Sequence, residues 1–360
     1  MKLWGWTTIR QALSKHWRDW GSLFLALWAS FMIFLAALVG FQYFVPLAWW
    51  SGSSAAQYVA IPYGTSTVQI ANRLVHDEVI RSAFWFRFYA RVLGYDRQIK
   101  AGFFQLNGRM SLRRVLAKVG RRNDSGSLVR VTFPEGVPVT QMGKILQARG
   151  LMDAGEFVGF VRKAKPIFIQ RYPFLRVAPS DSLEGFLFPD TYFIANGSDP
   201  SMIVDMALHR FQEKIIGAWE ADGGDMKDKY GFYQILTMAS MLEMEAQRQS
   251  ELPIIASVFY NRLSRGMPLA SDPTVLYAMG LMTKAVVTYS DVAIDSPYNT
   301  YRQKGFPPTP ISSPGLAAFR AALHPGHSGY LFFVADGQGG HHFTQTYQQH
   351  LAAQRGSVGK

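Results

Sequence analysis

The chain contains no cysteine, which excludes disulfide bridges, thiol nucleophiles and cysteine-ligated metal sites. Charged residues are also scarce, at 17% of 360 residues, and 25 acidic residues stand against 37 lysines and arginines. The net charge of +12 favours an anionic polymer or a membrane surface as partner, although scattered, solvated basic side chains explain it equally well. No nucleic-acid-binding motif is present, so we expect no nucleic acid partner.

Two common catalytic motifs are missing as well. The chain has neither a glycine-rich phosphate-binding loop nor the G-x-S-x-G turn of serine hydrolases. His324 and His327 have metal-like spacing, but the Pro-Gly between them interrupts a helix and no carboxylate is near in sequence. We therefore expect neither a metal nor a cofactor.

One long segment near the start lacks charge altogether. Residues 20–41 contain only two polar side chains, Ser22 and Ser30, and a helix of this length crosses roughly 30 Å of hydrocarbon. Trp49 and Trp50 lie just beyond it, where aromatic side chains meet the membrane interface. The sequence predicts a transmembrane helix at 20–43, preceded by a tail at 1–19 and followed by a linker at 44–57.

The charges around this segment predict its orientation. The tail carries four basic residues (Lys2, Arg10, Lys15 and Arg18), whereas the first charged residue downstream is Arg73. The positive-inside rule then places the tail in the cytoplasm and the remainder outside, with a single membrane pass between them. A cleaved signal peptide is the alternative, but the apolar run is long for one and no clear cleavage site follows it.

Two similar units follow the linker, at 59–80 and 131–152. Their ungapped alignment matches five positions: Val59, Pro62, Gly64, Gln69 and Leu74 meet Val131, Pro134, Gly136, Gln141 and Leu146. Each unit is typical of a short strand, a Pro/Gly turn and an amphipathic helix. A polar break at 121–127 separates a small βα module at 58–125 from a larger mixed domain at 126–360, so the predicted fold class is α+β.

The segment 238–280 predicts three short helices joined by tight turns. On the first, Glu243 shares a face with Ala239, Ser240 and Gln247, among Met and Leu side chains. Burial there would raise the pKa of Glu243 and keep it protonated as a general acid, while Glu245, two residues on, would point to solvent. A solvated or ion-paired helical glutamate is the competing interpretation.

Three other carboxylates could act beside Glu243: Glu184, Asp190 and Asp272. Asp272-Pro273 has the pattern of a helix N-cap followed by proline, and Asp190 follows a proline as turn-forming residues do. Late in the chain, polar and aromatic residues that could stack on and hydrogen-bond sugars gather in loops: Tyr298, Asn299, Tyr301 and Gln338.

Seven ordered motifs give the chain a family resemblance. They are EGFLFPDTY at 184–192, ASMLEMEA at 239–246, ASVFYNRL at 256–263, SDPTVLYAMG at 271–280, YNTY at 298–301, GFPPTPISSPG at 305–315 and YLFFVADGQGGHHF at 330–343. With them the chain resembles the endolytic murein transglycosylases of the YceG-like family, membrane-anchored lyases of the cell wall. The resemblance implies a LysM-like domain at 58–125 and a catalytic transglycosylase domain at 126–360.

The resemblance also implies site residues. The family's catalytic glutamate is the first of an E-K-E motif, a position that Glu243 occupies here, with Met244 where the family has lysine. Residues expected to bind substrate are Asn261, Asp272, Thr274, Tyr298, Asn299 and His341, together with Gln247 on the helix of Glu243. The expected partners are peptidoglycan glycan strands, the inner membrane and peptidoglycan synthases.

The implied reaction suits a lone buried carboxylate. Hydrolases use two carboxylates, whereas a lytic transglycosylase lets the 6-hydroxyl of the substrate replace water, so one glutamate can give a proton and then take one back. The expected reaction cleaves the MurNAc–GlcNAc bond of nascent strands, leaves 1,6-anhydroMurNAc ends and terminates elongation. Two alternatives stay open: a non-catalytic glycan-binding scaffold, and a hydrolase that pairs Glu243 with Asp272 or Asp190.

Overall fold

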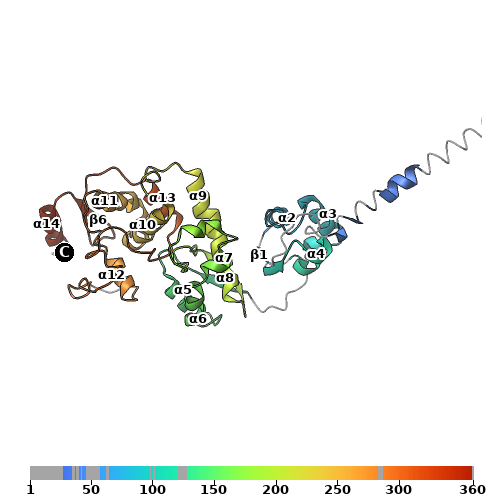
Figure 1. Ribbon diagram of the computed structural model, residues 1–360, viewed down its shortest axis with the longest axis horizontal. Helices are drawn as coiled ribbons and strands as arrows, with labels where there is room; N and C mark the ends of the chain where they lie inside the picture. The colour runs from blue at the N-terminus through green and yellow to red at the C-terminus, as the bar shows by residue number, and fades with distance from the viewer. Residues whose placement is uncertain are drawn as a thin grey trace, which may run out of the picture. The chain divides into compact units, whose positions relative to one another are not determined.

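The computed structural model describes residues 27–34, 37, 40–41, 43–45, 57–61, 65–97, 99, 102–120, 128–282 and 287–358. The chain divides into two compact units, residues 1–124 and 125–360. Both are mixed α+β, with many helices and small two-stranded antiparallel sheets (Figure 1). The predicted α+β class is therefore confirmed at this level.

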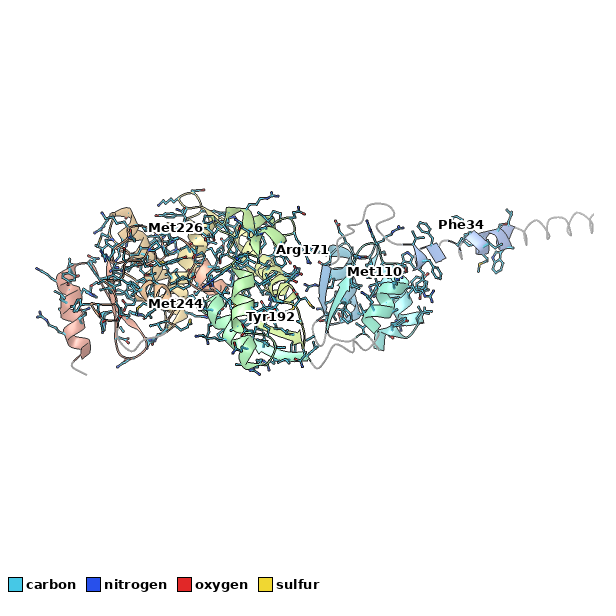
Figure 2. All side chains as sticks on the ribbon, turned by 60° about the horizontal axis from the view of Figure 1, so that its bottom comes forward. Phe34, Met110, Arg171, Tyr192, Met226 and Met244 are labelled. Atoms are coloured by element: carbon cyan, nitrogen blue, oxygen red, sulfur yellow. The ribbon has the colours of Figure 1, made fainter. Side chains whose placement is uncertain are left out.

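The predicted transmembrane segment is described only in part. Residues 27–34 are helical and expose large apolar side chains, among them Trp28, Phe31 and Phe34 (Figure 2). No helix within the described residues has both the length and the apolar content that a membrane crossing requires. The tail at 1–19 and most of the linker at 44–57 lie outside the described residues, so the anchor stays a prediction.

The first unit follows the order strand, two helices, strand, helix. β1 (Gln57–Ile61) pairs with β2 (Gly102–Leu106), and α2 (Thr67–His76), α3 (Ala83–Val92) and the 3-10 turn η2 (Tyr95–Arg97) lie between them in the chain. α4 (Leu112–Gly120) follows. Ser66 and Gln69 form a capping box: the Ser66 Oγ accepts from the Gln69 N–H, and the Gln69 side chain accepts from the Ser66 N–H.

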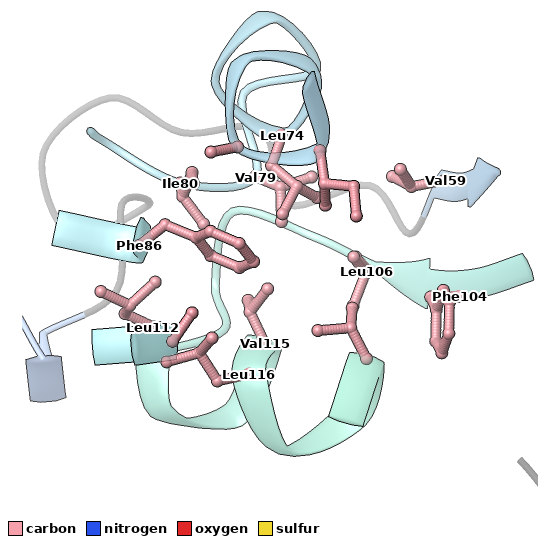
Figure 3. Close-up of a cluster of buried hydrophobic side chains, with 14 of the residues drawn as sticks. Val59, Leu74, Val79, Ile80, Phe86, Phe104, Leu106, Leu112, Val115 and Leu116 are labelled. Carbon is pink, nitrogen blue, oxygen red and sulfur yellow. The ribbon is translucent and has the colours of Figure 1, made fainter. Parts of the chain in front are cut away.

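One hydrophobic core holds this unit together (Figure 3). Leu74 of α2, Phe86 of α3, Leu116 of α4 and Leu106 of β2 are fully buried and belong to this one cluster. Every element of the unit thus contributes apolar side chains to one core, as expected of a small domain whose burial must offset the conformational entropy of the chain.

The second unit begins with β3 (Leu128–Thr132), which pairs antiparallel with β4 (Thr191–Ala195) and sets Val131 opposite Tyr192. Between the two strands lie α5 (Val139–Ala148), α6 (Ala154–Val161), α7 (Lys165–Phe168) and the 3-10 turn η3 (Pro173–Val177). The strand–turn–helix prediction for 131–152 is confirmed by β3 and α5. β4 had not been predicted.

After β4 the chain is helical as far as Ala278 apart from short connections. α8 (Pro200–Phe211) continues through the π-helical turn η4 (Gln212–Ile216) into α9 (Gly217–Ala221). α10 (Phe232–Glu245), α11 (Leu252–Ser264) and α12 (Asp272–Ala278) confirm the three helices predicted for 238–280, and the 3-10 turn η5 (Gln249–Glu251) precedes α11. The predicted N-cap at Asp272 is wrong by one residue, because Ser271 is the N-cap and Asp272 is the first helical residue.

The chain ends with α13 (Leu316–Leu323), a hairpin of β5 (Phe332–Ala335) and β6 (His341–Thr344), and α14 (Tyr347–Val358). The hairpin was predicted, but β5 is half-buried, not the buried strand that its composition had indicated. α10 packs against α11, α12 and α13, while α5, α6 and α8 form a separate group in the same unit (Figure 1). From Ile235 to Leu242, α10 is entirely buried.

Candidate active site

The last turns of α10 lie beside residues 311–315 and are hydrogen-bonded to them. The Ser240 Oγ accepts from the Ile311 N–H at 3.0 Å and donates to the Thr237 carbonyl at 2.7 Å. The Ser312 Oγ donates to the Ser240 carbonyl at 2.9 Å. These bonds fix the loop that carries Gly315 beside the next turn of the helix, where Glu243 lies.

Glu243 sits where two glycines approach α10. The Gly315 N–H donates to its Oε2 at 2.9 Å, and a Cβ built on Gly136 would lie 3.5 Å from its Cγ. Among the described residues, the other carboxylate oxygen has no hydrogen-bond partner. Burial raises the pKa of Glu243 to about 7, and the nearby Glu135 adds to the rise. At neutral pH a large share of Glu243 therefore carries a proton, as a general acid must.

Glu135 is a neighbour of Glu243 that the sequence had not suggested. Its Oε1 reaches so close to Gly315 that a Cβ there would lie 1.9 Å from it, so Gly315 touches both glutamates. The turn is held by two backbone bonds, from the Gly136 N–H to the Ser313 carbonyl at 2.9 Å and from the Ser313 N–H to the Val137 carbonyl at 3.0 Å. The available signal was the Pro-Glu-Gly turn of the second repeated unit, which the alignment matched at proline and glycine only.

Glu245 differs from its prediction. It does not point to open solvent: the Ser271 Oγ donates to its Oε1 at 2.5 Å, and burial raises its pKa to about 7, helped by Asp272 and opposed by Arg262. The reason is that α12 and its N-cap Ser271 pack over the last turn of α10. Glu245 thus shares the raised pKa of Glu243, but a side-chain hydroxyl of the fold already occupies one of its oxygens.

The other predicted carboxylates have structural partners. Both oxygens of Glu184 are engaged: the Val139 N–H donates to Oε1 at 3.0 Å and the Tyr277 hydroxyl to Oε2 at 3.3 Å. Burial raises the pKa of Glu184 to about 7. Asp190 pairs with Arg210 at 2.7 Å. The carboxylate that acts on the protonation of Glu243 is therefore Glu135, and neither Asp190 nor Asp272 is among the causes of its shift.

Three of the expected substrate-binding residues make hydrogen bonds within the fold. Asn261 donates to the carbonyls of Ser328 and Tyr330, and Asn299, fully buried, donates to those of Val292 and Ile294. Thr274 is buried too and donates to the Ser271 carbonyl at 2.7 Å. These side chains hold loops in place around α10 and α12.

The other four are half-buried or exposed. The Asp272 Oδ1 accepts from the Tyr301 hydroxyl at 2.6 Å, and His341 Nδ1 lies 2.7 Å from Glu251 Oε2. Gln247 is exposed, and its Oε1 lies 3.4 Å from where a Cβ on Gly339 would be. The Tyr298 hydroxyl lies 3.0 Å from the Thr309 Oγ1.

Tyr298 borders a cavity of about 660 Å³, a size typical of ligand pockets. The Tyr277 ring, 4.9 Å from that of Tyr298, forms part of the same wall, and Glu184 lies at its edge. The remaining lining comes from five segments: Pro138, Val139 and Thr140; Val158 and Arg162; Pro179, Ser180 and Ser182; Gly280 and Leu281; and Pro308 and Thr309.

No group of three or more potential ligands for a metal ion occurs within the described part of the chain. His324, the first histidine of the HPGH motif, lies 2.7 Å from Asp222 Oδ1, so a carboxylate is close in space although none is close in sequence.

The α10 region offers carboxylates, hydroxyls and backbone N–H groups, which suit proton transfer to and from an oxygen-rich substrate.

Comparisons with known proteins agree in one family. The YceG-like family matches residues 59–356. An endolytic murein transglycosylase of Bacillus subtilis (strain 168) is 35% identical over 305 residues, which cover 82% of this chain and 83% of that protein. One of Streptococcus pneumoniae serotype 2 (strain D39) is 29% identical over 337 residues, 85% of this chain but 60% of that longer protein. The crystal structure of a putative yceG-like protein of Listeria monocytogenes aligns with a TM-score of 0.57 and 31% identity, covering 83% of this chain and 99% of that one.

Proposed function

Because the chain belongs to the YceG-like family, we propose that it is a lytic transglycosylase, a lyase that acts on peptidoglycan. We infer that it cuts the MurNAc–GlcNAc bond within nascent strands, leaves 1,6-anhydroMurNAc ends and so terminates elongation. The observation that carries this proposal is the last turn of α10, where burial raises the pKa of Glu243 to about 7 and the Gly315 N–H donates to one of its two carboxylate oxygens.

In the proposed mechanism, Glu243 gives its proton to the glycosidic oxygen as the bond from that oxygen to C1 of MurNAc breaks. The electron pair stays on the leaving oxygen, and C1 becomes electron-poor. The 6-hydroxyl of the same sugar then attacks C1 and passes its proton to the Glu243 carboxylate, which restores the acid. Attack from within one sugar avoids the entropy of recruiting a water molecule.

The surroundings of Glu243 support both halves of this cycle. Burial favours the protonated form that starts the reaction. The Gly315 N–H favours the carboxylate that follows proton transfer, because it donates to Oε2. The two effects oppose each other and hold the pKa near 7, where a group can act as acid and base in turn.

The test compares three variants with wild type on isolated glycan strands. We expect Glu243→Gln to lower kcat by about 10²–10⁴-fold while fold and glycan binding persist. Glu245→Gln is the competitor on the same helix and is expected to lose far less. Glu220→Gln, an exposed glutamate of α9, is the matched control. Full loss in Glu245→Gln with near-normal Glu243→Gln would move the acid to Glu245.

Glu135 favours a second candidate, a hydrolase with two carboxylates at one site. Mass spectrometry of the released fragments separates the two reactions, since a hydrolase leaves reducing ends and a transglycosylase leaves anhydro ends. Reducing ends from the wild-type protein would reject the lyase. Binding to sacculi without any released fragment would point instead to a non-catalytic scaffold.

We further propose that the enzyme is anchored in the inner membrane through residues 20–43, with its larger unit outside the cytoplasm and within reach of peptidoglycan synthases. The apolar run and the basic tail support this. We also propose that the first unit is LysM-like and binds glycan, which its β1–α2–α3–β2 order and antiparallel sheet support. Protease accessibility of the intact chain in membrane vesicles tests the orientation.

A further inference from the structure

The cavity beside Tyr298 and Glu184 is connected to the proposed active site through the chain itself. On one side, its wall of Pro138, Val139 and Thr140 directly follows the Glu135–Gly136 turn that contacts Glu243. On the other, Pro308 and Thr309 are followed by Ile311, which is hydrogen-bonded to Ser240 of α10. Two residues span at most about 7 Å, so the cavity begins within about one sugar length of the Gly136 backbone.

The carboxylate and the phenol groups of this cavity have little hydrogen-bonding capacity left for sugar hydroxyls. Glu184 already accepts bonds at both oxygens, one of them from Tyr277, and the Tyr298 hydroxyl is within hydrogen-bond distance of Thr309. A buried sugar would bring several hydroxyl donors that find no free carboxylate or amide acceptor there, at a cost for each unmade bond. Much of the remaining wall is apolar, formed by proline, valine and leucine side chains.

The charge of the cavity points to an anionic group. Arg162 lines it, is exposed, and forms no ion pair among the described residues. Its positive charge reaches the buried Glu184, whose pKa it lowers slightly against the larger effect of burial. An exposed arginine that has no ion-pair partner among the described residues and lines a largely apolar cavity is suited to a carboxylate on a ligand with small apolar groups.

We propose that this cavity, the Arg162 cavity, binds the peptide that branches from MurNAc in the strand, with Arg162 paired to a peptide carboxylate. The inference rests on the proposed function, since it concerns the same substrate. A stem peptide complements each part of the wall. Its methyl groups can pack against the prolines and valines, its backbone can hydrogen-bond to the serine and threonine hydroxyls, and its carboxylates can pair with the arginine. Its attachment to the sugar next to the cleaved bond fits a cavity one sugar away from Glu243.

The first experiment compares strands that carry peptides with strands stripped of them by an amidase. For Arg162→Glu in the full chain, we expect KM on peptide-bearing strands to rise about tenfold, the effect of losing one charge-assisted pair, with kcat nearly unchanged. On stripped strands the variant should match wild type. Arg162→Lys should recover part of the loss. Lys163→Glu, the neighbouring exposed cation that does not line the cavity, is the matched control.

Ser180→Trp narrows the cavity without altering its charge, and it should also raise KM on peptide-bearing strands alone. This variant separates a binding cavity from simple attraction between Arg162 and an anionic polymer. Equal effects of Arg162→Glu on both kinds of strand, or no effect on either, would overturn the proposal. Equal effects on both kinds of strand would mean that the cavity binds the sugar chain and not the peptide.

Direct binding keeps this inference distinguishable from the proposed function. The probe is the free pentapeptide stem, titrated into the full chain and followed by calorimetry. We expect a dissociation constant about tenfold weaker for Arg162→Glu than for wild type, and an unchanged one for Lys163→Glu. Wild-type protein that binds the peptide but releases no anhydro ends would reject the lyase only. Normal cleavage without any peptide binding would reject the cavity assignment only.

Discussion

Three glutamates of the second unit, Glu184, Glu243 and Glu245, share one physical property. Burial raises the pKa of each to about 7. The sequence pattern predicted a buried carboxylate with a raised pKa on α10, and Glu243 is buried with its pKa raised to about 7. It could not rank the three, because the packing of Ser271 over Glu245 and of Val139 against Glu184 depends on segments distant in the chain. Burial therefore identifies the class of residue, and the hydrogen-bond partners distinguish its members.

The pH dependence of kcat/KM should report Glu243 directly. The reaction starts from the protonated acid, so kcat/KM should be level below pH 7 and fall tenfold per pH unit above it, with an apparent pKa of about 7. Glu135→Gln removes the negative charge that helps raise this pKa, so the fall should begin about half a pH unit lower. Initial rates from pH 5 to 9 measure both.

The control for that shift is Glu156→Gln, an exposed glutamate of α6 that is not among the causes of the Glu243 shift. Its profile should match wild type. A profile for Glu135→Gln that is unshifted, or shifted to higher pH, would show that Glu135 does not influence the acid in solution.

At the scale of elements, the junction between α10 and residues 311–315 positions both glutamates at Gly315. Gly315→Ala should cut kcat by about 10²-fold, because the added methyl group occupies the place of the Glu135 carboxylate and shifts the N–H that holds Glu243. The φ of Gly315 is −77°, which alanine adopts without strain, so stability should change little. Steady-state rates and thermal unfolding are the two measurements.

Gly231→Ala is the matched control for that substitution. Gly231 is likewise the residue before a helix, at the start of α10, with φ of −68°, and a Cβ there meets nothing within 4 Å. The rate should stay within twofold of wild type. If both variants lose activity alike, the loss would come from the helix starts and not from the crowding of Glu135.

Glu184 acts as a cap for α5, whose own N-cap residue, Pro138, has no side-chain acceptor. Its folded-state pKa of about 7 lies above the unfolded value of 4.5. Between these values the unfolded chain releases the proton while the folded one keeps it, so rising pH favours unfolding, and the loss is complete above pH 7. Glu184→Gln keeps an acceptor for Val139 but cannot ionise. Its stability relative to wild type should rise from pH 5 to pH 8, by at most about 3 kcal/mol.

Denaturant unfolding at the two pH values measures this difference, and the other titrating groups cancel because both proteins contain them. Glu184→Ala, which removes the acceptor, should lose about 1 kcal/mol at pH 5. A stability difference between Glu184→Gln and wild type that is the same at both pH values would contradict ionisation of a buried Glu184.

Elements indicated by a local pattern were predictable, whereas the pairing of segments distant in the chain was not. The capped, periodic helices α10 to α12 and the β5–β6 hairpin needed only neighbouring residues. β4 escaped prediction, and because its partner β3 lies some sixty residues earlier, no neighbouring segment indicated the pairing. The contact between Glu135 and the α10 site could not be predicted from the sequence either, because the two segments are far apart in the chain.

At the scale of the whole molecule, the division at residues 124 and 125 separates the proposed chemistry from the proposed anchor. Glu135, Glu243, Gly315 and the entire lining of the Arg162 cavity belong to residues 125–360. The first unit has its own core around Phe86 and Leu116. Each unit thus contains what it needs to fold, and the site needs side chains from the second alone.

A chain of residues 125–360 should therefore fold and cleave soluble strands with kcat within about twofold of the full protein. Its KM on long strands should rise, because the unit that we propose to bind glycan is missing, while its KM on short strands should not. Steady-state rates on strands of defined length measure the split, and Glu243→Gln within the shorter chain gives the background. Loss of kcat in a chain that still unfolds cooperatively would show that the first unit contributes to the chemistry, since correct folding would leave no other cause for the loss.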